Sequence, residues 1–169
     1  MKTRGFTVVE IIITVTVMGI LLLLAVVNVN SSQANARDDQ RKADTQAIAI
    51  ALESFYTIRP NTSAATGRYP STNQVASEAS IRTLMPDAII TSFIAPGSDT
   101  VSESFRTATN SNETTTGVLP QPTPAQYVYQ PLDAAGNLCT LTATVCRKFN
   151  LFYRLEGDST VYRVESRNR

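Results

Sequence analysis

The residues of this chain whose type and spacing could do chemistry lie at its amino terminus. Glu10 is the one charged residue between Phe6 and Val27, a stretch of 22 residues. A carboxylate inside an apolar helix costs about 2.5–3.5 kcal/mol at the middle of a bilayer, so such a residue is a candidate functional site. The alternative interpretation is that Glu10 lies one turn from the helix start and extends to the lipid headgroups.

The apolar run predicts a transmembrane helix over residues 6–27. At about 1.5 Å per residue, a helix of this length crosses a hydrocarbon core of about 30 Å. Lys2 and Arg4 precede it without an acidic neighbour, which predicts an amino terminus in the cytoplasm. The residues after Val27 contain no A-x-A-like cleavage site, so we expect the segment to be retained as an anchor.

Composition argues against catalysis and against a metal site. The chain has no histidine and two cysteines, which excludes imidazole bases, His–metal clusters and Cys–His nucleophiles. Asp133, Glu156 and Asp158 could be imagined as a carboxylate group, but their spacing gives no support for an active site. With 15 basic and 14 acidic residues, the charge balance indicates no preference for nucleic acid. The sequence therefore predicts no enzyme, no cofactor and no metal.

Four residues at the amino-terminal end of this segment form a recognisable signal. Gly5, Phe6, Thr7 and Glu10 resemble the class III signal of type IV prepilins. The resemblance implies that residues 1–5 are a prepilin leader, that a membrane-embedded aspartyl peptidase cleaves between Gly5 and Phe6, and that the new terminus on Phe6 is N-methylated. It also implies that Phe6 and Glu10 set the register of subunits during assembly.

Cleavage after Gly5 has a chemical consequence that does not depend on the family. It removes Lys2 and Arg4 and no acidic residue, which changes the formal net charge from +1 to −1. It also creates a cationic amine on Phe6, which can pair with a carboxylate on a neighbouring helix. A buried charge that is costly alone becomes tolerable once it is paired and hydrogen-bonded. Glu10 is therefore predicted to act in assembly.

A second helical segment follows the polar residues 28–33 and is predicted to end by Arg59. Pro60 ends it because proline disfavours α geometry in the residue before it. Six apolar residues with 3/4 spacing give this segment one apolar stripe, namely Ala47, Ile48, Ala51, Leu52, Phe55 and Ile58. The predicted long helix covers residues 6–59, and its part 28–59 is the spine of a head domain.

Charged residues gather near the start of that spine. They are Arg37, Asp38, Asp39, Arg41, Lys42 and Asp44. Asp38 and Lys42 form an i,i+4 pair that supports a helix. We interpret the cluster as a solvated helix face; salt bridges between subunits of a helical filament are the alternative.

The resemblance to pilins extends beyond the leader. Residues 36–44 and 51–56, followed by Gly67-Arg68-Tyr69-Pro70, look like the segment shared by pilins and the major pseudopilins of type II secretion. This similarity covers roughly the first 70 residues. Gly19 matches a glycine of many pilins, but Val27 stands where those proteins usually carry proline, so melting of the helix in a filament is less expected.

Residues 60–124 are predicted to connect the helix to the head domain. Ser71 and Gln74 can form a capping box and Pro86 stops a helix, which predicts a short helix over residues 73–85. The Ser/Thr-rich stretch from Pro96 to Pro124 has few apolar residues, so we expect an exposed, mobile loop. This loop is either a linker or a variable, glycosylated outward surface.

Residues 125–169 are predicted to form an antiparallel sheet. Strand candidates are Tyr127–Tyr129, residues 148–156 and residues 160–165, with a tight turn at Gly157-Asp158. One face of this sheet should cover the apolar stripe of the helix.

The two cysteines lie in the same predicted loop. Cys139 and Cys146 have six residues between them, so they do not form a C-x-x-C redox motif, and without histidine they cannot complete a zinc site. We expect a disulfide between them rather than free thiols. Closing so short a loop is worth about 2–3 kcal/mol at most.

The predicted fold is α+β and pilin-like, with a long amino-terminal helix packed on a small antiparallel sheet. The predicted function is that of a structural subunit of a type IV pilus-like surface filament, used for adhesion, motility or DNA uptake. The implied partners are other copies of the chain, minor pilins, prepilin peptidase, the inner-membrane platform and the assembly ATPase. We expect a single-pass prepilin in the cytoplasmic membrane and then an extracellular filament. The alternatives are a pseudopilin of a type II secretion or competence system and a membrane-anchored binding protein that does not polymerise.

Overall fold

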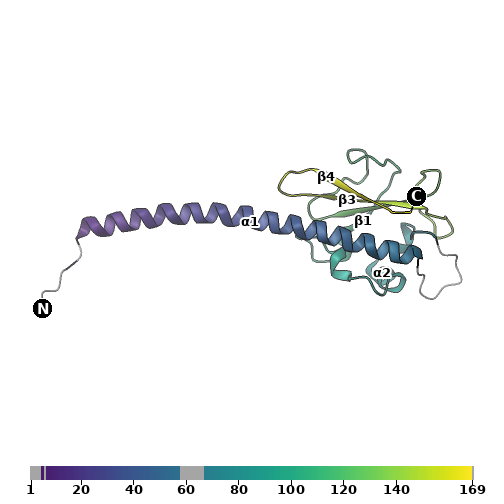
Figure 1. Cartoon of the computed structure of the whole chain (residues 1–169), viewed down its shortest axis with the longest axis horizontal. Coiled ribbons are helices and arrows are strands. Elements are labelled where there is room, and N and C mark those ends of the chain that lie inside the picture. The colour runs from purple at the N-terminus through teal and green to yellow at the C-terminus, as the bar shows by residue number, and fades with distance from the viewer. Residues whose placement is uncertain (1–4, 6, 58–66, 169) are drawn as a thin grey trace. The chain divides into compact units, whose positions relative to one another are not determined.

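The chain divides into two compact units, residues 1–36 and residues 37–169, called here the N-terminal unit and the head unit. The computed structural model describes residues 5, 7–57 and 67–168, with backbone alone for residues 24–30. Helix α1 runs from Val8 to Thr57 and contributes to both units (Figure 1). Its carboxyl end lies close to the predicted Arg59, which is itself outside the described residues.

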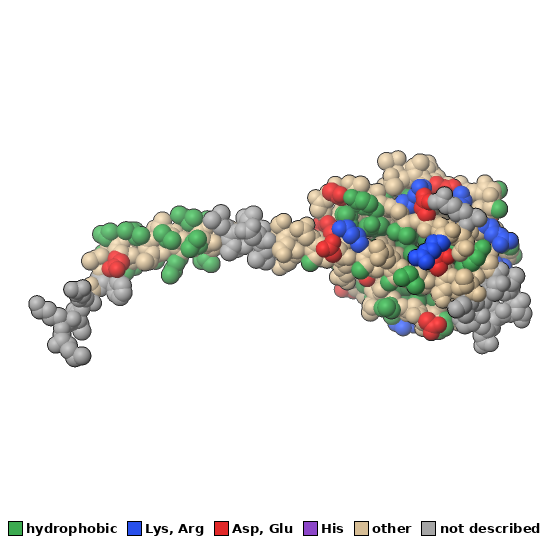
Figure 2. Space-filling model, in the orientation of Figure 1, with side chains coloured by type: hydrophobic (Ala, Val, Ile, Leu, Met, Phe, Trp, Pro, Cys, Tyr) green, Lys and Arg blue, Asp and Glu red, His purple; other side chains and the backbone are tan. Residues whose placement is uncertain are grey.

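The N-terminal unit is an apolar stretch of α1 whose large side chains are exposed. From Val8 to Leu23 they all point into open space rather than into a protein core, and Figure 2 shows hydrophobic side chains over this part of the helix. The described residues include no helix that is both long enough and apolar enough to cross a bilayer. Phe6 and the side chains of residues 24–30, which belong to the predicted span, lie outside the described residues.

The head unit is built on the carboxyl-terminal part of α1. Ile48, Leu52 and Phe55 follow i, i+4, i+7 spacing, so they share one helix face, and all three are buried. The predicted apolar stripe is therefore confirmed at these positions, with Ala51 half-buried beside them. Ile58, the last residue of that stripe, lies outside the described residues.

A four-stranded sheet in the order β1-β2-β3-β4 packs against this stripe. β2 (Tyr127–Leu132), β3 (Lys148–Arg154) and β4 (Val161–Glu165) are antiparallel neighbours and match the three predicted strands. The turn between β3 and β4 contains the predicted Gly157-Asp158 pair. Figure 1 shows the sheet, with β1, β3 and β4 labelled, alongside the carboxyl-terminal part of α1.

The prediction of a purely antiparallel sheet is wrong at one edge. β1 (Phe105–Thr107) pairs with β2 in parallel, with Phe105 opposite Tyr127. It directly follows the four-residue helix α3 (Val101–Ser104) and is three residues long. So short a strand shows no alternation in the sequence, because the two-residue period needs about four residues to be visible.

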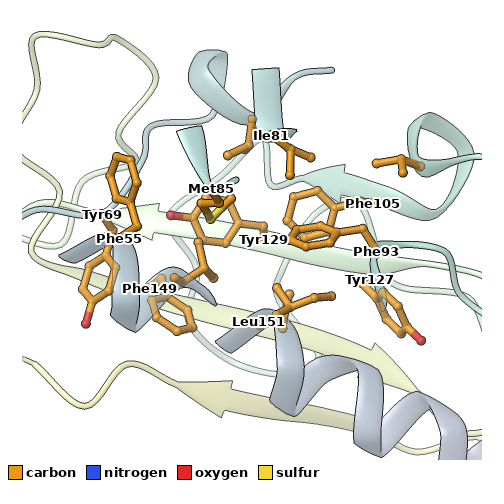
Figure 3. Close-up of a cluster of buried hydrophobic side chains, with 14 of the residues drawn as sticks. Phe55, Tyr69, Ile81, Met85, Phe93, Phe105, Tyr127, Tyr129, Phe149 and Leu151 are labelled. Atoms are coloured by element: carbon orange, nitrogen blue, oxygen red, sulfur yellow. The ribbon is translucent and has the colours of Figure 1, made fainter. Parts of the chain in front are cut away.

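Aromatic side chains fill the space between the helix and the sheet. Tyr69 packs edge-on against Phe149 of β3 with ring centroids 4.9 Å apart, and Phe93 meets Phe105 at the same distance. Tyr129 of β2 stacks on Phe105. Figure 3 shows these rings converging with Phe55 of α1 in one cluster. Such pairs add about 0.5–1.5 kcal/mol each beyond the burial of their area.

The predicted helix over residues 73–85 is present as two pieces. η1 (Asn73–Val75) is a 3₁₀ turn, and α2 (Glu78–Leu84) starts at Ser77, whose side chain accepts a hydrogen bond from the Ser80 amide. The side chain of Gln74 accepts a bond from the Ser71 amide, as in a capping box, but it closes the 3₁₀ turn rather than opening a long helix. A further 3₁₀ turn, η2 (Ile90–Phe93), follows before the Ser/Thr-rich stretch.

The prediction that this Ser/Thr-rich stretch is exposed is wrong for part of it, and its predicted mobility stays a prediction. Its residues 108–121, called here the strap, cover the face of the sheet that is turned away from α1, where Val118 packs with Val128 and Phe152. The buried Gln130 side chain donates to the carbonyl oxygens of Asn110 and Asn112 at 2.8 and 3.0 Å. A stretch with few apolar residues is thus held in place because the sheet supplies polar partners for its backbone.

Candidate functional site

The first turn of α1 positions the residues that the sequence singled out for processing and assembly. Thr7 precedes the helix, and its hydroxyl accepts a hydrogen bond from the Glu10 amide at 3.3 Å. Gly5 and Glu10 are both exposed, and Phe6 lies outside the described residues. Thr7 is therefore the residue that starts the helix next to the predicted cleavage point, a role that the Thr-x-x-Glu spacing indicates.

Glu10 combines two properties in this position. It lies in the first helical turn, where the partial positive charge of the free amides favours a carboxylate. Among the described residues its side chain has no hydrogen-bond or ion-pair partner. A carboxylate that is exposed and held close to the helix terminus can accept a cation from outside the chain.

The helix surface that follows Glu10 has almost no polar group that needs a hydrogen-bond partner from outside the helix. The hydroxyl groups of Thr14 and Thr16 donate to the carbonyl oxygens of Ile11 and Ile12, at 2.8 and 2.7 Å, so neither needs an outside partner. A side chain at Gly19 would meet nothing within 4 Å, so this glycine marks open room on the helix surface. A helix that is apolar on all sides is normally covered by other helices or by lipid.

The charge cluster near Arg37 belongs to the head unit and is used within the chain. Asp38, Arg41 and Asp44 are 6%, 2% and 9% exposed, so the prediction of a solvated face is wrong for these three residues. Arg41 donates to Asp38 at 2.8 Å and reaches Glu156 at 3.4 Å. Asp39 and Lys42 do form an exposed pair on the helix surface, as predicted for the whole cluster.

Asp38 connects the helix to the β3–β4 turn through the backbone. Its two oxygens accept hydrogen bonds from the amides of Glu156 and Gly157, each at 2.8 Å. Burial opposes ionisation of Asp38, but these two amides and Arg41 outweigh it and hold the pKa of the carboxyl below its usual value. Asp38 is therefore ionised and fully bonded at neutral pH.

Two arginines complete this connection. Arg41 also donates to the carbonyl oxygens of Pro124 and Pro96, at 2.6 and 3.3 Å, which mark the ends of the Ser/Thr-rich stretch. Arg37 donates two hydrogen bonds to the Glu156 carboxylate, at 2.9 and 2.6 Å, and this contact lowers the pKa of the Glu156 carboxyl. Arg37, Asp38, Arg41 and Glu156 therefore connect α1 to the β3–β4 turn and to the segment before β2. These four residues are called here the clamp.

A polar contact that the sequence gave no reason to expect lies at the other end of α1. Glu53 accepts hydrogen bonds from the Tyr69 hydroxyl, the Arg167 amide and the Asn168 side chain, at 2.9, 2.7 and 2.9 Å. Burial, together with Glu53, raises the pKa of Tyr69 to about 12. The only sign of this contact in the sequence is that Glu53 is an acidic residue next to the apolar stripe. That position does not identify its hydrogen-bond partners.

The three carboxylates considered for catalysis are not brought together. Asp133 binds the amides of Ala135 and Asn137 in its own turn. Asp158 accepts from the Thr160 amide and the Tyr162 hydroxyl, and Glu156 belongs to the clamp described above. In the part of the chain that the structure describes, no group of His, Cys, Asp or Glu side chains could hold a metal ion.

Cys139 and Cys146 both lie in the loop between β2 and β3. Both are fully buried free thiols within hydrogen-bonding reach of each other. The predicted disulfide between them stays a prediction.

Comparison with known proteins gives one partial similarity. No protein-family model matches the chain, and no solved structure matches it. The chain is 34% identical over 55 residues to the type IV major pilin protein PilA of Myxococcus xanthus (strain DK1622). The matched stretch is 32% of this chain and 25% of the relative, so the chain spans about a quarter of the length of the relative that it matches. The similarity to a pilin is therefore local.

Proposed function

We propose that this chain is a structural subunit, a pilin, that polymerises into a type IV pilus-like surface filament after cleavage between Gly5 and Phe6. The observation that carries the proposal is the exposed apolar surface from Val8 to Leu23 with one carboxylate, Glu10, in its first turn. The Gly5-Phe6-Thr7 signal and the partial similarity to a major pilin support the same conclusion.

Assembly would follow from the chemistry of the new amino terminus. Removal of residues 1–5 gives Phe6 a cationic amine, and Glu10 of a neighbouring subunit supplies the carboxylate that accepts it. Between apolar helices the two charges tolerate burial only as a pair, so subunits in the wrong axial register are disfavoured by several kcal/mol. Glu10 therefore selects the register, and the apolar surface supplies the buried area.

The proposal includes a route and a set of partners. The prepilin spans the cytoplasmic membrane once, with its amino terminus inside, and the subunit then leaves into an extracellular filament. Prepilin peptidase cleaves and N-methylates Phe6, and an inner-membrane platform with its assembly ATPase adds subunits. Other copies of the chain and minor pilins are its partners in the filament, which serves adhesion, motility or DNA uptake.

The first experiment is amino-terminal sequencing and intact-mass measurement of protein sheared from the cell surface. The proposal predicts a chain that begins at Phe6 with one added methyl group and that is recovered from filaments. A processed chain found in short periplasmic or membrane-bound assemblies would favour the pseudopilin alternative. A chain that still carries Met1 or Lys2 and stays in the membrane fraction would contradict the proposal and favour an anchored binding protein.

A Glu10→Gln variant tests the role of the charge. Glutamine at this position still suits the Thr7 cap, so helix initiation is kept while the charge is removed. Because breaking a buried ion pair costs about 3–5 kcal/mol, we expect the amount of protein in sheared filaments to fall about 100-fold or more. Thr14→Val is the control, since that hydroxyl bonds only within its own helix. Normal filaments from Glu10→Gln would rule out charge pairing as the register.

A further inference from the structure

Four of the six large hydrophobic side chains that are exposed in the described part of the head unit lie in two places. Ile50 and Ile89 border one hollow of the surface, and Leu141 and Val145 lie on one loop. Single exposed hydrophobic residues are ordinary on a protein surface, but several of them gathered around a hollow or on a loop mark a contact site. Both places are therefore candidates for contact with another molecule.

The hollow lies between α1 and the segment that follows α2, and it has a volume of about 320 Å³. Phe55 and Met85, which are buried, form its floor, and the exposed Ile50 and Ile89 form its two rims. The Ala88 amide donates to the Met85 carbonyl at 3.0 Å, which fixes the wall opposite α1. The hollow is called here the groove, and it is lined chiefly by Ala47, Ile50, Ala51, Phe55, Met85 and Ile89.

The second place is a turn in the loop between β2 and β3. It consists of residues 140–145 and is called here the knob. The Thr144 amide donates to the Leu141 carbonyl at 3.0 Å, which closes the turn. Cys139 and Cys146, on either side of it, are both buried. The knob is therefore an exposed turn on a base that is anchored in the head unit.

The knob and the groove are complementary in polarity. The knob contains leucine, alanine, valine and three threonines, so an apolar groove can accept it without burying a charge. One charged residue lies beside each: Arg147 follows the knob, and Asp87 lines the groove, and both are exposed. Among the described residues neither has an ion-pair partner, and Arg147 donates only to the Gly67 carbonyl. A contact between the two places can therefore add an ion pair of opposite charges at its edge.

We propose that the knob of one subunit docks in the groove of the next subunit, with Leu141 between Ile50 and Ile89. The inference rests on the proposed function, because it needs copies of the chain that polymerise. The groove and the knob share no residue, so the contact is heterologous: each subunit offers its knob to one neighbour and its groove to another. A contact of this kind continues from subunit to subunit instead of closing into a dimer.

The contact is small, and its size determines when it forms. Two apolar side chains from each partner cover far less than the area of about 1,200–2,000 Å² that a stable protein–protein interface buries. Subunits in solution therefore do not associate through it. In a filament the apolar surfaces of the N-terminal units already hold neighbours together, and the resulting effective concentration lets a weak contact form. The contact then adds to the affinity of each subunit for the end of the filament.

The contact is tested by placing charges on its two sides in the full-length chain and measuring the protein in sheared filaments by immunoblot. Ile89→Lys puts a cation on the rim of the groove, and Leu141→Asp puts a carboxylate on the knob. Both side chains are exposed, so the melting temperature of the head unit should not change. Because each charge alone must be buried against an apolar surface, we expect each single variant to lose filaments about tenfold or more. In the double variant the two charges meet across the contact, so the yield should return to within about threefold of the wild type.

Ile89→Lys/Leu141→Lys is the matched control, since it places like charges across the contact and should not recover. Leu119→Lys, at an exposed leucine of the strap, should leave filaments within about twofold of the wild type. Full yields from both single variants, or a double variant no better than the weaker single one, would overturn the contact and leave the proposed function standing. A loss in one single variant alone would show that this surface meets another partner, which also overturns it. Wild-type protein that forms no filament would overturn the proposed function and the contact together.

Discussion

Asp38 and Asp39 are neighbours in the sequence with opposite environments, and they form a matched pair for mutation. Asp38 accepts three hydrogen bonds in a buried clamp, whereas Asp39 makes one exposed contact with Lys42. Asp38→Asn removes the nearer of the two carboxylates that pair with the buried Arg41, which keeps only Glu156 at 3.4 Å, and it turns amide hydrogens toward backbone donors. We expect a loss of about 2–4 kcal/mol in the free energy of unfolding, measured by urea denaturation.

Asp39→Asn is the control and should change the free energy of unfolding by less than about 0.5 kcal/mol. Equal effects of the two substitutions would contradict the assignment of Asp38 to a buried clamp. A filament defect in Asp38→Asn without any loss of stability would favour the alternative role between subunits.

The lowered pKa of Asp38 predicts that the stability of the head unit depends on pH. The pKa values of Asp38 and Glu156 are lower in the folded head unit than in the unfolded chain. Their contribution to stability is therefore fully present above the unfolded pKa, about 4, and is lost as the pH falls through the lower folded value. We expect the melting temperature to fall between about pH 5 and pH 3, with a smaller fall in Asp38→Asn. Parallel curves for the two proteins would contradict the role of Asp38.

At the scale of the elements, the strap determines whether the outer face of the sheet is closed. Val118 of the strap is fully buried against the sheet, and the next residue, Leu119, is 53% exposed. Val118→Ala removes two methyl groups from a packed site and should cost about 2 kcal/mol. Thermal unfolding measures this loss, and hydrogen exchange at the Thr109 amide, which donates to the Leu119 carbonyl, should increase.

Leu119→Ala is the control for the strap and should be nearly neutral, because substitutions at exposed positions usually stay within about 0.5 kcal/mol. If both substitutions proved neutral, the stretch would be the mobile linker that its composition indicates. If both proved costly, the contacts of the strap would extend beyond the cluster around Val118, Val128 and Phe152.

At the scale of the whole molecule, the hydrophobic clusters that the structure describes lie within the head unit. Both hydrophobic clusters consist of residues from Ile48 onward, and the clamp starts at Arg37. We expect a fragment of residues 37–169 to unfold in one cooperative transition, measured by circular dichroism and calorimetry. Leu52→Asp in the same fragment buries a charge in the core and should abolish the transition. A fragment without cooperative unfolding would show that the head unit depends on the N-terminal unit.

The sequence predicted what depends on local pattern. The 3/4 spacing of Ile48, Leu52 and Phe55 identified the buried helix face, and the alternation from residue 148 onward identified β3, because each period reports which side of one element is apolar. It also placed Glu10 within one turn of the helix start. Glu10 was identified as the one carboxylate in an apolar segment, whereas Gly5 and Phe6 came from the resemblance to the prepilin signal; their roles in processing and assembly stay predictions.

The tertiary structure decided what depends on distant partners. Asp38 and the Gly157 amide are 119 positions apart, so the sequence could not show that this charge is used inside the chain. The parallel strand β1, the strap over Phe152 and the contacts of Tyr69 with Glu53 and Phe149 are likewise made between residues far apart in the sequence. Periodicity records how polar a position is, but the partner that satisfies a polar group is chosen only when the chain folds back on itself.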